Sequence, residues 1–226
     1  MSDLSRPFAL ALASSALLLA ACGGDDGEEE TTTKSSRGEC RQVSLPPVKS
    51  QSFKKPAPVL ARGESATASV QTSCGTFVIK LDTEQSPATA NSFAFLAEQG
   101  FYDDTVFHRI VPDFVIQGGD PKGTDPQQAG GGGPGYSVRE PPPQRAEYTR
   151  GVVAMAKTGV EPPGTSGSQF FVVTAPADAG LPPDYAIVGR VIHGMDAVAA
   201  IAKLGDPATE MPTKTVVIDS IAIETG

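Results

Sequence analysis

The sequence predicts a mostly β fold, a closed eight-stranded antiparallel barrel capped by two α-helices. Three observations lead to this prediction. From residue 66 onward, short runs rich in β-branched and aromatic residues alternate with turns that contain glycine or proline. Two segments in the same region instead repeat apolar residues at helical spacing. Eight strands suffice to close a small barrel around a core of side chains, which leaves two open ends for helices to plug.

The strands begin with a hairpin. The runs ATASVQT and CGTFVIKL alternate apolar and polar residues around a short turn, which predicts two paired strands. Six further runs have the same character and lie at residues 106–110, 114–117, 151–156, 170–174, 186–191 and 216–223.

Two helices are expected, one early and one late. Ser86 is a preferred N-cap residue, Pro87 suits the first helical position, and the apolar face that follows ends at Gly100. The second helix is expected over residues 195–204, where apolar residues recur near helical spacing before Gly205 stops it.

Composition limits the functions that this chain can have. It has 226 residues, of which 39% are hydrophobic, enough for one good core. Its net charge is -8, and the region from residue 66 onward carries 18 acidic and 10 basic residues. Phosphate binding needs a basic face, so we expect no nucleic-acid partner. Two histidines and three cysteines leave little for a metal site.

The N-terminus has the features of an export signal. Arg6 precedes an apolar run at residues 8–19 that is too short to span a bilayer comfortably. The sequence Leu19-Ala20-Ala21-Cys22 resembles a bacterial lipobox, in which signal residues 1–21 are removed and Cys22 becomes the lipid-modified first residue. Two acyl chains would then tether the protein to the cell membrane outside the cytoplasm. Because Asp3 offsets Arg6, an ordinary secretory signal or an uncleaved anchor remains an alternative.

Residues 22–65 are predicted to form a lipidated, largely disordered tether to a domain at residues 66–226. The tether combines low hydrophobicity, scattered prolines and a carboxylate run that is best explained as a solvated spacer. Outside the cytoplasm Cys40 and Cys74 can form a disulfide, and we expect them to pair; two unpaired thiols are the alternative. Closing a loop of this length would stabilise the fold by roughly 3–4 kcal/mol on the chain-entropy model.

Arg109 is out of place in its strand. The stretch FHRIVPDFVIQGGD, residues 107–120, is otherwise rich in β-branched and aromatic residues, and a guanidinium that cannot lose its charge is costly there unless something uses it. The stretch GTDPQQAGGGGPGYSV lacks the lysine and serine of a phosphate-binding loop and is expected to be a surface loop.

Several motifs together resemble the cyclophilin family of peptidyl-prolyl isomerases across residues 68–224. They are FHRIVPDFVIQGGD, GGGGPGY, MAKTG with GTSGSQFFVVTA, and LPPDYAIVGRVIHGMDAV. The resemblance implies an eight-stranded antiparallel barrel with two helices and a substrate groove on one outer face. It also implies an enzyme that accelerates X-Pro bond rotation without metal, cofactor or covalent intermediate, as a monomer acting on proline-containing polypeptides. With an export signal, its substrates are expected to be exported proteins that it helps to fold.

The reaction explains why an arginine is needed. Partial double-bond character sets a barrier of about 18–20 kcal/mol to rotation about the peptide bond. As the amide twists, the prolyl nitrogen recovers its lone pair, and a preorganised donor there stabilises the transition state. The resemblance gives this role to Arg109. A charged hydrogen bond worth about 1.5–3 kcal/mol more in the twisted state would supply roughly ten- to a hundredfold in rate.

The resemblance assigns the other site residues by motif position. Phe114, Met155, Phe171 and Leu181 are expected to form the wall around the proline ring, and Gln117 to bind the substrate backbone. The catalytic set is therefore Arg109, Phe114, Gln117 and Phe171. The substrate-binding positions, among which Ala156 and Lys157 pair through their backbone with the extended peptide, are Val115, Met155, Ala156, Lys157, Gln169, Leu181 and Tyr185.

Each assignment has a structural alternative. The apolar wall residues would be ordinary core in most barrels. Arg109 could form a structural ion pair under a loop, and Gln117 could be a buried strand amide. His108 should point away from the groove, since successive strand residues face opposite sides, and should be packed and hydrogen-bonded.

Three features depart from the best-known family pattern. The chain has no tryptophan and has Gly180 near where many eukaryotic members place one, which puts cyclosporin sensitivity in doubt. Tyr185 stands where those members have a histidine. Lys157 replaces an asparagine, and the loop at residues 158–168 is longer.

Two other functions fit the sequence less well. A non-catalytic chaperone or adaptor that binds proline peptides would have no reason to retain the four catalytic positions together. A hydrolase would need a serine or cysteine beside a histidine, but His108 lies in a strand and His193 is far along the chain.

Overall fold

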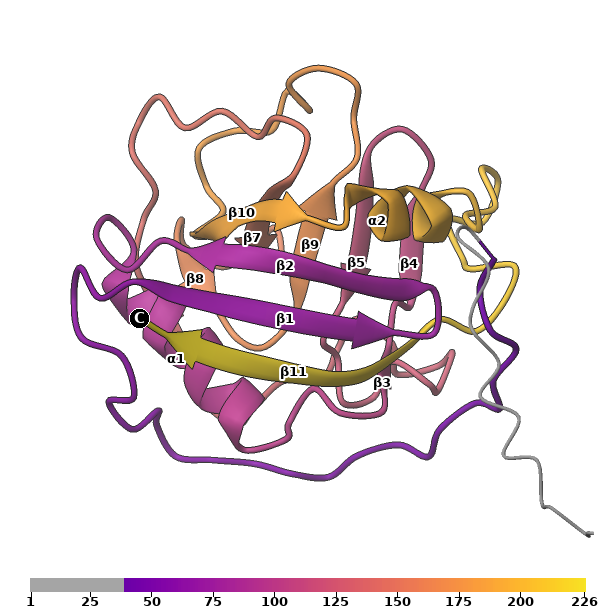
Figure 1. Ribbon diagram of the computed structural model, residues 1–226, viewed down its shortest axis with the longest axis horizontal. Coiled ribbons are helices and arrows are strands. Elements are labelled where there is room, and N and C mark those ends of the chain that lie inside the picture. The colour runs from indigo at the N-terminus through magenta and orange to yellow at the C-terminus, as the bar shows by residue number, and fades with distance from the viewer. Residues whose placement is uncertain (1–38) are drawn as a thin grey trace, which may run out of the picture. The chain divides into compact units, whose positions relative to one another are not determined.

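The computed structural model describes residues 39–226 (Figure 1). Within this range the chain forms two helices and a series of mostly short strands. Their order is β1 (Ala66–Thr72), β2 (Gly75–Leu81), α1 (Pro87–Glu98), β3 (Thr105–Val106), β4 (Arg109–Val111), β5 (Val115–Gly118), β6 (Val138–Arg139), β7 (Val152–Met155), β8 (Thr165–Ser166), β9 (Phe170–Val173), β10 (Ile187–His193), α2 (Met195–Ala202) and β11 (Val217–Thr225).

The main sheet is an antiparallel half-barrel of nine strands rather than the closed eight-stranded barrel that the sequence predicts. Its order is β3-β11-β1-β2-β10-β7-β9-β5-β4, and β6 and β8 pair separately. The ninth strand arises because the run expected at 106–110 divides: β3 pairs with β11, whereas β4 pairs with β5. Phe107 and His108 connect these two strands, so the two edge strands of the curled sheet follow each other in the chain without pairing. Only the isolated bridge between Val106 and Asp120 joins the two ends across the described chain.

Residues alternate between two buried faces in the central strands. In β9, Phe170 and Val172 belong to the main core inside the curl, whereas Phe171 and Val173 belong to a second apolar cluster on the outer face. The main core also contains an aromatic group, in which the ring of Phe170 lies edge-on to Phe93 of α1 with centroids 5.5 Å apart. Because the outer cluster is separate from the main core, a binding site on the outer face does not expose the main core to solvent.

The helices lie on different parts of the sheet, as the prediction of two capping helices requires (Figure 1). α1 packs against β10 and β11, and α2 packs against β2, β4 and β5. α1 begins at Pro87 as predicted, but the side chain of Ser86 makes no cap hydrogen bond. Instead, the Glu140 carboxylate accepts hydrogen bonds from the N–H groups of Ala88 and Thr89 at 3.2 and 2.7 Å. A carboxylate at this end of a helix also interacts favourably with the helix dipole.

Residues 39–65, which we call the strap, do not fit the prediction of a disordered tether. They form neither helix nor strand, but they run along the domain past α1 (Figure 1). Cys40 and Cys74 form a disulfide, and the ring of Phe53 packs edge-on against Phe95 with centroids 5.1 Å apart. The side-chain amide of Asn91 accepts hydrogen bonds from two strap N–H groups. Ordering the strap costs conformational entropy, which its own composition cannot offset; these contacts with the domain offset it.

The predicted signal peptide at residues 1–21 and the predicted lipid-attachment residue Cys22 lie outside the described residues. Between residues 39 and 226, no helix has both the length and the apolar character that crossing a membrane requires. The same part of the chain contains no group of three or more His, Cys, Asp or Glu side chains arranged to hold a metal ion.

Candidate active site

The predicted catalytic residues form a row across neighbouring strands. Arg109 of β4 is paired with Gln117 of β5, Gln117 with Phe171 of β9, and Phe171 with Ala154 of β7. Directly paired residues in a sheet point to the same face. The register therefore places a guanidinium, an amide and an aromatic ring side by side on the outer face of the sheet.

A hollow of about 160 Å³, which we call the first hollow, lies over this row. The side chain of Arg109 is 36% exposed and borders it. The hollow is open to solvent beside the guanidinium, as a site for a substrate ring requires. It collects nine of the eleven predicted catalytic and substrate-binding residues: Arg109, Phe114, Val115, Gln117, Ala156, Lys157, Phe171, Leu181 and Tyr185.

Met155 does not line the hollow, so its assignment to the wall was wrong. It is 1% exposed and belongs to the main core inside the curl. Its strand partner is Phe170, another core residue, whereas its neighbour Ala154 pairs with Phe171 on the outer face. Because strand side chains alternate between faces, a shift of one position moves a residue from one surface to the other.

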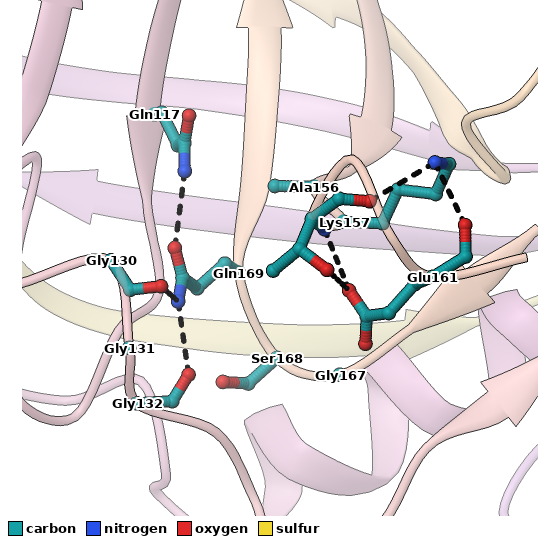
Figure 2. Close-up of a pocket in the computed structure, with 11 residues that line it drawn as sticks. Gln117, Gly130, Gly131, Gly132, Ala156, Lys157, Glu161, Gly167, Ser168 and Gln169 are labelled. Atoms are coloured by element: carbon teal, nitrogen blue, oxygen red, sulfur yellow. Dashed lines mark hydrogen bonds between the residues drawn. The ribbon is translucent and has the colours of Figure 1, made fainter.

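Gln169, the other predicted residue missing from the first hollow, lines a second hollow of about 220 Å³ beside it (Figure 2). The Nε2 of Gln117 donates to the Oε1 of Gln169 at 3.1 Å. The Nε2 of Gln169 donates in turn to the carbonyl oxygens of Gly130 and Gly132 at 3.0 and 2.9 Å. Gln169 thus fixes the amide of Gln117 and ties it to the glycine-rich loop.

The glycine-rich loop is a wall of the second hollow and not merely a surface loop. A buried carboxylate organises it, because Asp120 is 1% exposed and accepts hydrogen bonds from the N–H groups of Gly130 and Gly132 at 2.6 and 3.3 Å. A Cβ atom at Gly132 would lie 1.9 Å from the Oδ1 of Asp120. Sequence reasoning missed this role, although the aspartate of QGGD followed closely by a run of glycines is the signal that carries it.

The guanidinium of Arg109 also forms an ion pair with Glu210, a residue outside the motifs that predict the site. The Oε2 of Glu210, in the loop between α2 and β11, lies 2.7 Å from the Nε of Arg109. The Nη1 of Arg109 donates to the Oε1 of Gln117 at a long 3.5 Å. The structure therefore contains the ion pair that we considered as a structural alternative for Arg109. It also contains the open hollow beside the guanidinium that a catalytic role requires. No sequence signal points to Glu210, because it is 101 residues from Arg109.

Tyr185 closes one side of the first hollow. Its ring is edge-on to Phe171 with centroids 5.5 Å apart, and the Nζ of Lys157 lies 5.6 Å from the centroid of the Tyr185 ring. The hydroxyl of Tyr148 donates to the carbonyl of Tyr185 at 2.8 Å and accepts from its N–H at 3.1 Å. Burial raises the pKa of Tyr148 to about 12, so this phenol stays protonated and keeps its role as a donor.

The longer loop after Lys157 folds back on itself at the rim of the second hollow (Figure 2). The Nζ of Lys157 donates to the carbonyl oxygens of Thr158 and Glu161 at 3.2 and 3.1 Å. The Glu161 carboxylate accepts from the N–H and the hydroxyl of Thr158 at 2.6 and 2.8 Å. The ammonium of Lys157 is therefore turned toward its own loop as well as toward Tyr185.

His108 lies on the opposite side from Arg109, as the strand alternation requires. It lines a separate, mainly apolar hollow with Val106 and Met211. Its two ring nitrogens are buried and make no hydrogen bond of good geometry within the described chain, although the backbone of Val106 lies close enough to favour the protonated ring. Burial lowers the pKa of His108, which favours the neutral imidazole.

The fold and the first hollow define a protein that can hold a peptide on the outer face of a curled sheet beside a charged donor. Residues 67–223 match the family described as "Cyclophilin type peptidyl-prolyl cis-trans isomerase/CLD". The chain belongs to this family, and it is a cofactor-independent enzyme that interconverts the cis and trans forms of X-Pro peptide bonds.

Named relatives agree with this identification. "Peptidyl-prolyl cis-trans isomerase-like 1" of Neurospora crassa is 42% identical over 150 residues, which covers 63% of this chain and 87% of the relative. "Peptidyl-prolyl cis-trans isomerase ppi1" of Schizosaccharomyces pombe is 36% identical over 163 residues, covering 70% of this chain and 99% of the relative. These relatives are named as isomerases, and no finding favours the non-catalytic chaperone or adaptor.

A solved structure has the same fold. The crystal structure of a cyclophilin type peptidyl-prolyl cis-trans isomerase of Cryptosporidium parvum has a TM-score of 0.64 and 29% sequence identity, and the match covers 72% of this chain and 99% of that one. A second structure of that protein, in the presence of the dipeptide Ala-Pro, has a TM-score of 0.63 with the same identity and covers 71% of this chain and 99% of that one.

Proposed function

We propose that this isomerase acts on exported polypeptides while a lipid on Cys22 anchors it to the cell membrane, and that Arg109 is its catalytic donor. One observation carries the assignment of the site: the guanidinium of Arg109 borders an open hollow that is also lined by Phe171. A hollow lined by both polar and apolar side chains suits a substrate that is itself apolar at its ring and polar at its amide.

The first hollow would hold the proline ring. Phe114, Phe171 and Leu181 supply apolar surface for the ring, and burial of that surface favours binding. With the ring fixed, rotation is confined to the acyl side of the X-Pro bond. The amide of Gln117, oriented by Gln169, would bind the substrate backbone. This arrangement orients the substrate before any bond rotates.

Arg109 would act only as the bond rotates. In the planar amide the prolyl lone pair is conjugated with the carbonyl, so it is a poor acceptor. In the twisted state the lone pair returns to nitrogen, and an Nη–H group of Arg109 donates to it. Since this interaction is stronger in the twisted state than in the planar one, it accelerates rotation in both directions. No covalent bond forms or breaks.

The rest of the peptide would run across the border between the two hollows. Ala156 and Lys157 line both hollows, so the backbone there is within reach of a chain that leaves the first hollow. Part of this strip is already used, because the Ala156 N–H donates to the Gln169 carbonyl at 2.8 Å. The Cryptosporidium parvum structure in the presence of the dipeptide Ala-Pro supports a proline-containing ligand of this kind.

Two features support a location outside the cytoplasm. The first is the sequence of residues 1–22, with its apolar run and lipobox-like end. The second is the disulfide between Cys40 and Cys74, a bond that persists in oxidising compartments. The relatives named above are eukaryotic and give no support to lipid anchoring, so the anchoring rests on the sequence alone. We also propose that the enzyme acts as a monomer.

Metabolic labelling tests the anchoring. The full chain and its Cys22→Ala variant would be expressed in a bacterium with a lipoprotein pathway and fed radiolabelled palmitate. We expect the wild-type chain to take up label and to sediment with membranes, and the variant to do neither. An unlabelled wild-type chain in the secreted fraction would indicate an ordinary secretory signal, and an unlabelled, membrane-bound chain that keeps residues 1–21 would indicate an uncleaved anchor.

A further inference from the structure

Glu210 belongs to none of the motifs that predict the site, yet it contacts the proposed catalytic residue. Its Oε2 lies 2.7 Å from the Nε of Arg109, and the two side chains are 46% and 36% exposed. Ion pairs at this level of exposure contribute little to stability. A structural role alone is therefore a weak explanation for the pair.

The position of the contact on the guanidinium is more informative. Glu210 occupies Nε, which leaves the N–H groups of Nη1 and Nη2 available to the hollow. Gln117 contacts Nη1 from the neighbouring strand at 3.5 Å. Because the guanidinium is planar, contacts to two of its nitrogens fix both its position and its rotation. Of these two contacts, the one to Glu210 is short and charge-assisted, so it dominates.

The backbone of Glu210 is fixed in a way that serves this contact. Glu210 has a φ of +59°, a left-handed conformation that is uncommon for a residue with a side chain. Its carbonyl accepts from the N–H of Ile110 at 2.8 Å, and its own N–H donates to the carbonyl of Asp206 at 2.8 Å. Since Ile110 follows Arg109 directly in β4, the strand that carries the arginine also holds the loop that carries its partner.

We propose that Glu210 is a positioning residue for the isomerase reaction. Its carboxylate holds the Nε of Arg109 so that the two Nη atoms face the first hollow before substrate arrives. The inference rests on the proposed role of Arg109 as the catalytic donor. It predicts that loss of the carboxylate lowers kcat and leaves KM nearly unchanged, because the orientation of Arg109 matters in the twisted state and not in the bound planar state.

Three substitutions separate the side chain from the backbone of Glu210. Glu210→Ala removes the acceptor, and we expect about a tenfold fall in kcat from the loss of orientation. Glu210→Gln keeps an oxygen at the same reach, and we expect it to retain most of the wild-type kcat. Glu210→Asn tolerates the positive φ but is one methylene too short, so we expect it to behave like the alanine variant while the loop keeps its conformation.

A matched surface pair provides the control. Glu84 forms an ion pair with Arg62 at 3.8 Å, and these side chains are 71% and 68% exposed. Glu84→Ala should therefore leave kcat and KM unchanged. All variants would be compared in a coupled assay on a proline tetrapeptide, with thermal unfolding of the full chain measured alongside.

The Nε–H signal of Arg109 in an NMR spectrum reports on the contact independently of activity. It can be assigned by its loss in Arg109→Lys. In the wild type we expect slow exchange of this proton with water, and in Glu210→Ala and Glu210→Asn fast exchange. A structural role of Glu210 elsewhere in the loop would not change this proton selectively.

The outcomes distinguish this inference from the proposed function. If Arg109→Ala retains full activity, the proposed role of Arg109 fails. If Arg109→Ala is impaired but Glu210→Ala matches the wild type or exceeds it in kcat, only the positioning role fails, and a higher kcat identifies Glu210 as a competitor for the guanidinium. If Glu210 acts through Arg109, Glu210→Ala adds nothing in an Arg109→Ala background; an additive loss would contradict the inference.

Discussion

The substrate face and the strap side of this domain both bring distant segments together, but they leave different groups exposed. On the substrate face, by which we mean the two hollows, their lining residues and Glu210, polar groups stay at the surface beside apolar ones. Arg109 and its partner Glu210 are 36% and 46% exposed. Such groups are available to a substrate, and their mutual contacts contribute little to stability.

On the strap side, by which we mean the strap and the residues that it contacts, several groups are partly covered and hold the strap in place. The Nζ of Lys49 donates to the carbonyl oxygens of Gly100 and Asp103, and burial lowers the pKa of this ammonium. The ring of Phe53 packs against Phe95, and the disulfide fastens Cys40 near the beginning of the strap. The comparison indicates that the residues that act on substrate and the residues that hold the strap lie in different regions of the domain. Substitutions on the substrate face should change the rate, and substitutions on the strap side should change the free energy of unfolding.

The largest effect is expected from the disulfide. Replacing both Cys40 and Cys74 by serine should lower the free energy of unfolding by about 3–4 kcal/mol on the chain-entropy model. The kcat/KM at 25 °C should stay within about twofold of the wild type, since neither cysteine lines a hollow and such a change is under about 0.4 kcal/mol. Urea unfolding and the coupled assay measure the two quantities. A tenfold loss of activity in the folded variant would break the separation between the two regions.

Arg109→Ala should show the opposite pattern. We expect kcat/KM to fall roughly ten- to a hundredfold, or about 1.5–3 kcal/mol of transition-state stabilisation. The loss of its exposed pair with Glu210 should cost at most about 1 kcal/mol of unfolding free energy. Arg190→Ala is a suitable control, because Arg190 lines neither hollow. Wild-type activity in Arg109→Ala would show that the substrate face does not carry the chemistry.

The glycine-rich loop sharpens the comparison because the two regions meet there. The N–H of Phe53 in the strap donates to the carbonyl of Pro134 in this loop at 2.7 Å, and the N–H of Lys49 donates to the carbonyl of Pro121, just before the loop, at 2.9 Å. On its other side the loop accepts the amide of Gln169. A change in this loop is therefore expected to reach the second hollow.

Gly132→Ala tests this connection. The added Cβ would lie 1.9 Å from the Oδ1 of Asp120, so the loop has to move and the Gln169 contact is disturbed. We expect KM to rise about three- to tenfold, which corresponds to roughly 0.7–1.4 kcal/mol. Gly133→Ala is the matched control, since a Cβ there meets nothing within 4 Å. Equal kinetics for the two variants would contradict the role of the loop as a wall of the hollow.

The sequence predicts the substrate face better than the strap for a physical reason. The resemblance assigns Arg109 and Gln117 by motif position, and one short motif contains both because they lie on consecutive strands of one hairpin. Met155 shows the limit of this approach, because an error of one residue in a strand exchanges its two faces. Two sets of interactions have no local pattern: the contact of Glu210 with Arg109 across 101 residues, and the contacts of the strap other than its predicted disulfide. The composition of the strap is typical of a disordered segment.

The sequence correctly predicted a mostly β fold with two helices, but the prediction that the sheet closes into a barrel was wrong. The helix positions follow from hydrophobic periodicity and end signals, and both helices begin where the sequence places them. The strand count does not, because nine strands rather than eight form the main sheet and two more pair separately. Closure depends on which strands pair, and the chain at Phe107 and His108 changes partner between β11 and β5. His108 and Arg109 interrupt the apolar residues at this point, but this interruption does not show which strands pair on either side of it.

The smallest effect concerns His108, which lies next to Arg109 but faces the strap side. It shares its hollow with Leu45 of the strap. Burial lowers the pKa of His108; the Asp120 carboxylate and the Val106 carbonyl oppose this shift, and the charge of Arg109 adds to it. Between pH 7 and 5.5 the unfolded chain therefore binds a proton that the folded chain resists, and the free energy of unfolding should fall as the pH falls.

His108→Gln should flatten this pH dependence, because glutamine does not titrate. Urea unfolding at pH 7.0, 6.3 and 5.5 measures it, and the exposed His193, present in both proteins, serves as an internal control. Activity of the wild type over the same range should not follow the titration of His108, since this residue lines a hollow separate from the two on the substrate face. If the unfolding free energy of His108→Gln depends on pH as steeply as that of the wild type, His108 already takes up its proton in the folded state. In that case the strap side does not disfavour a charged group, and the contrast with the substrate face fails at this residue.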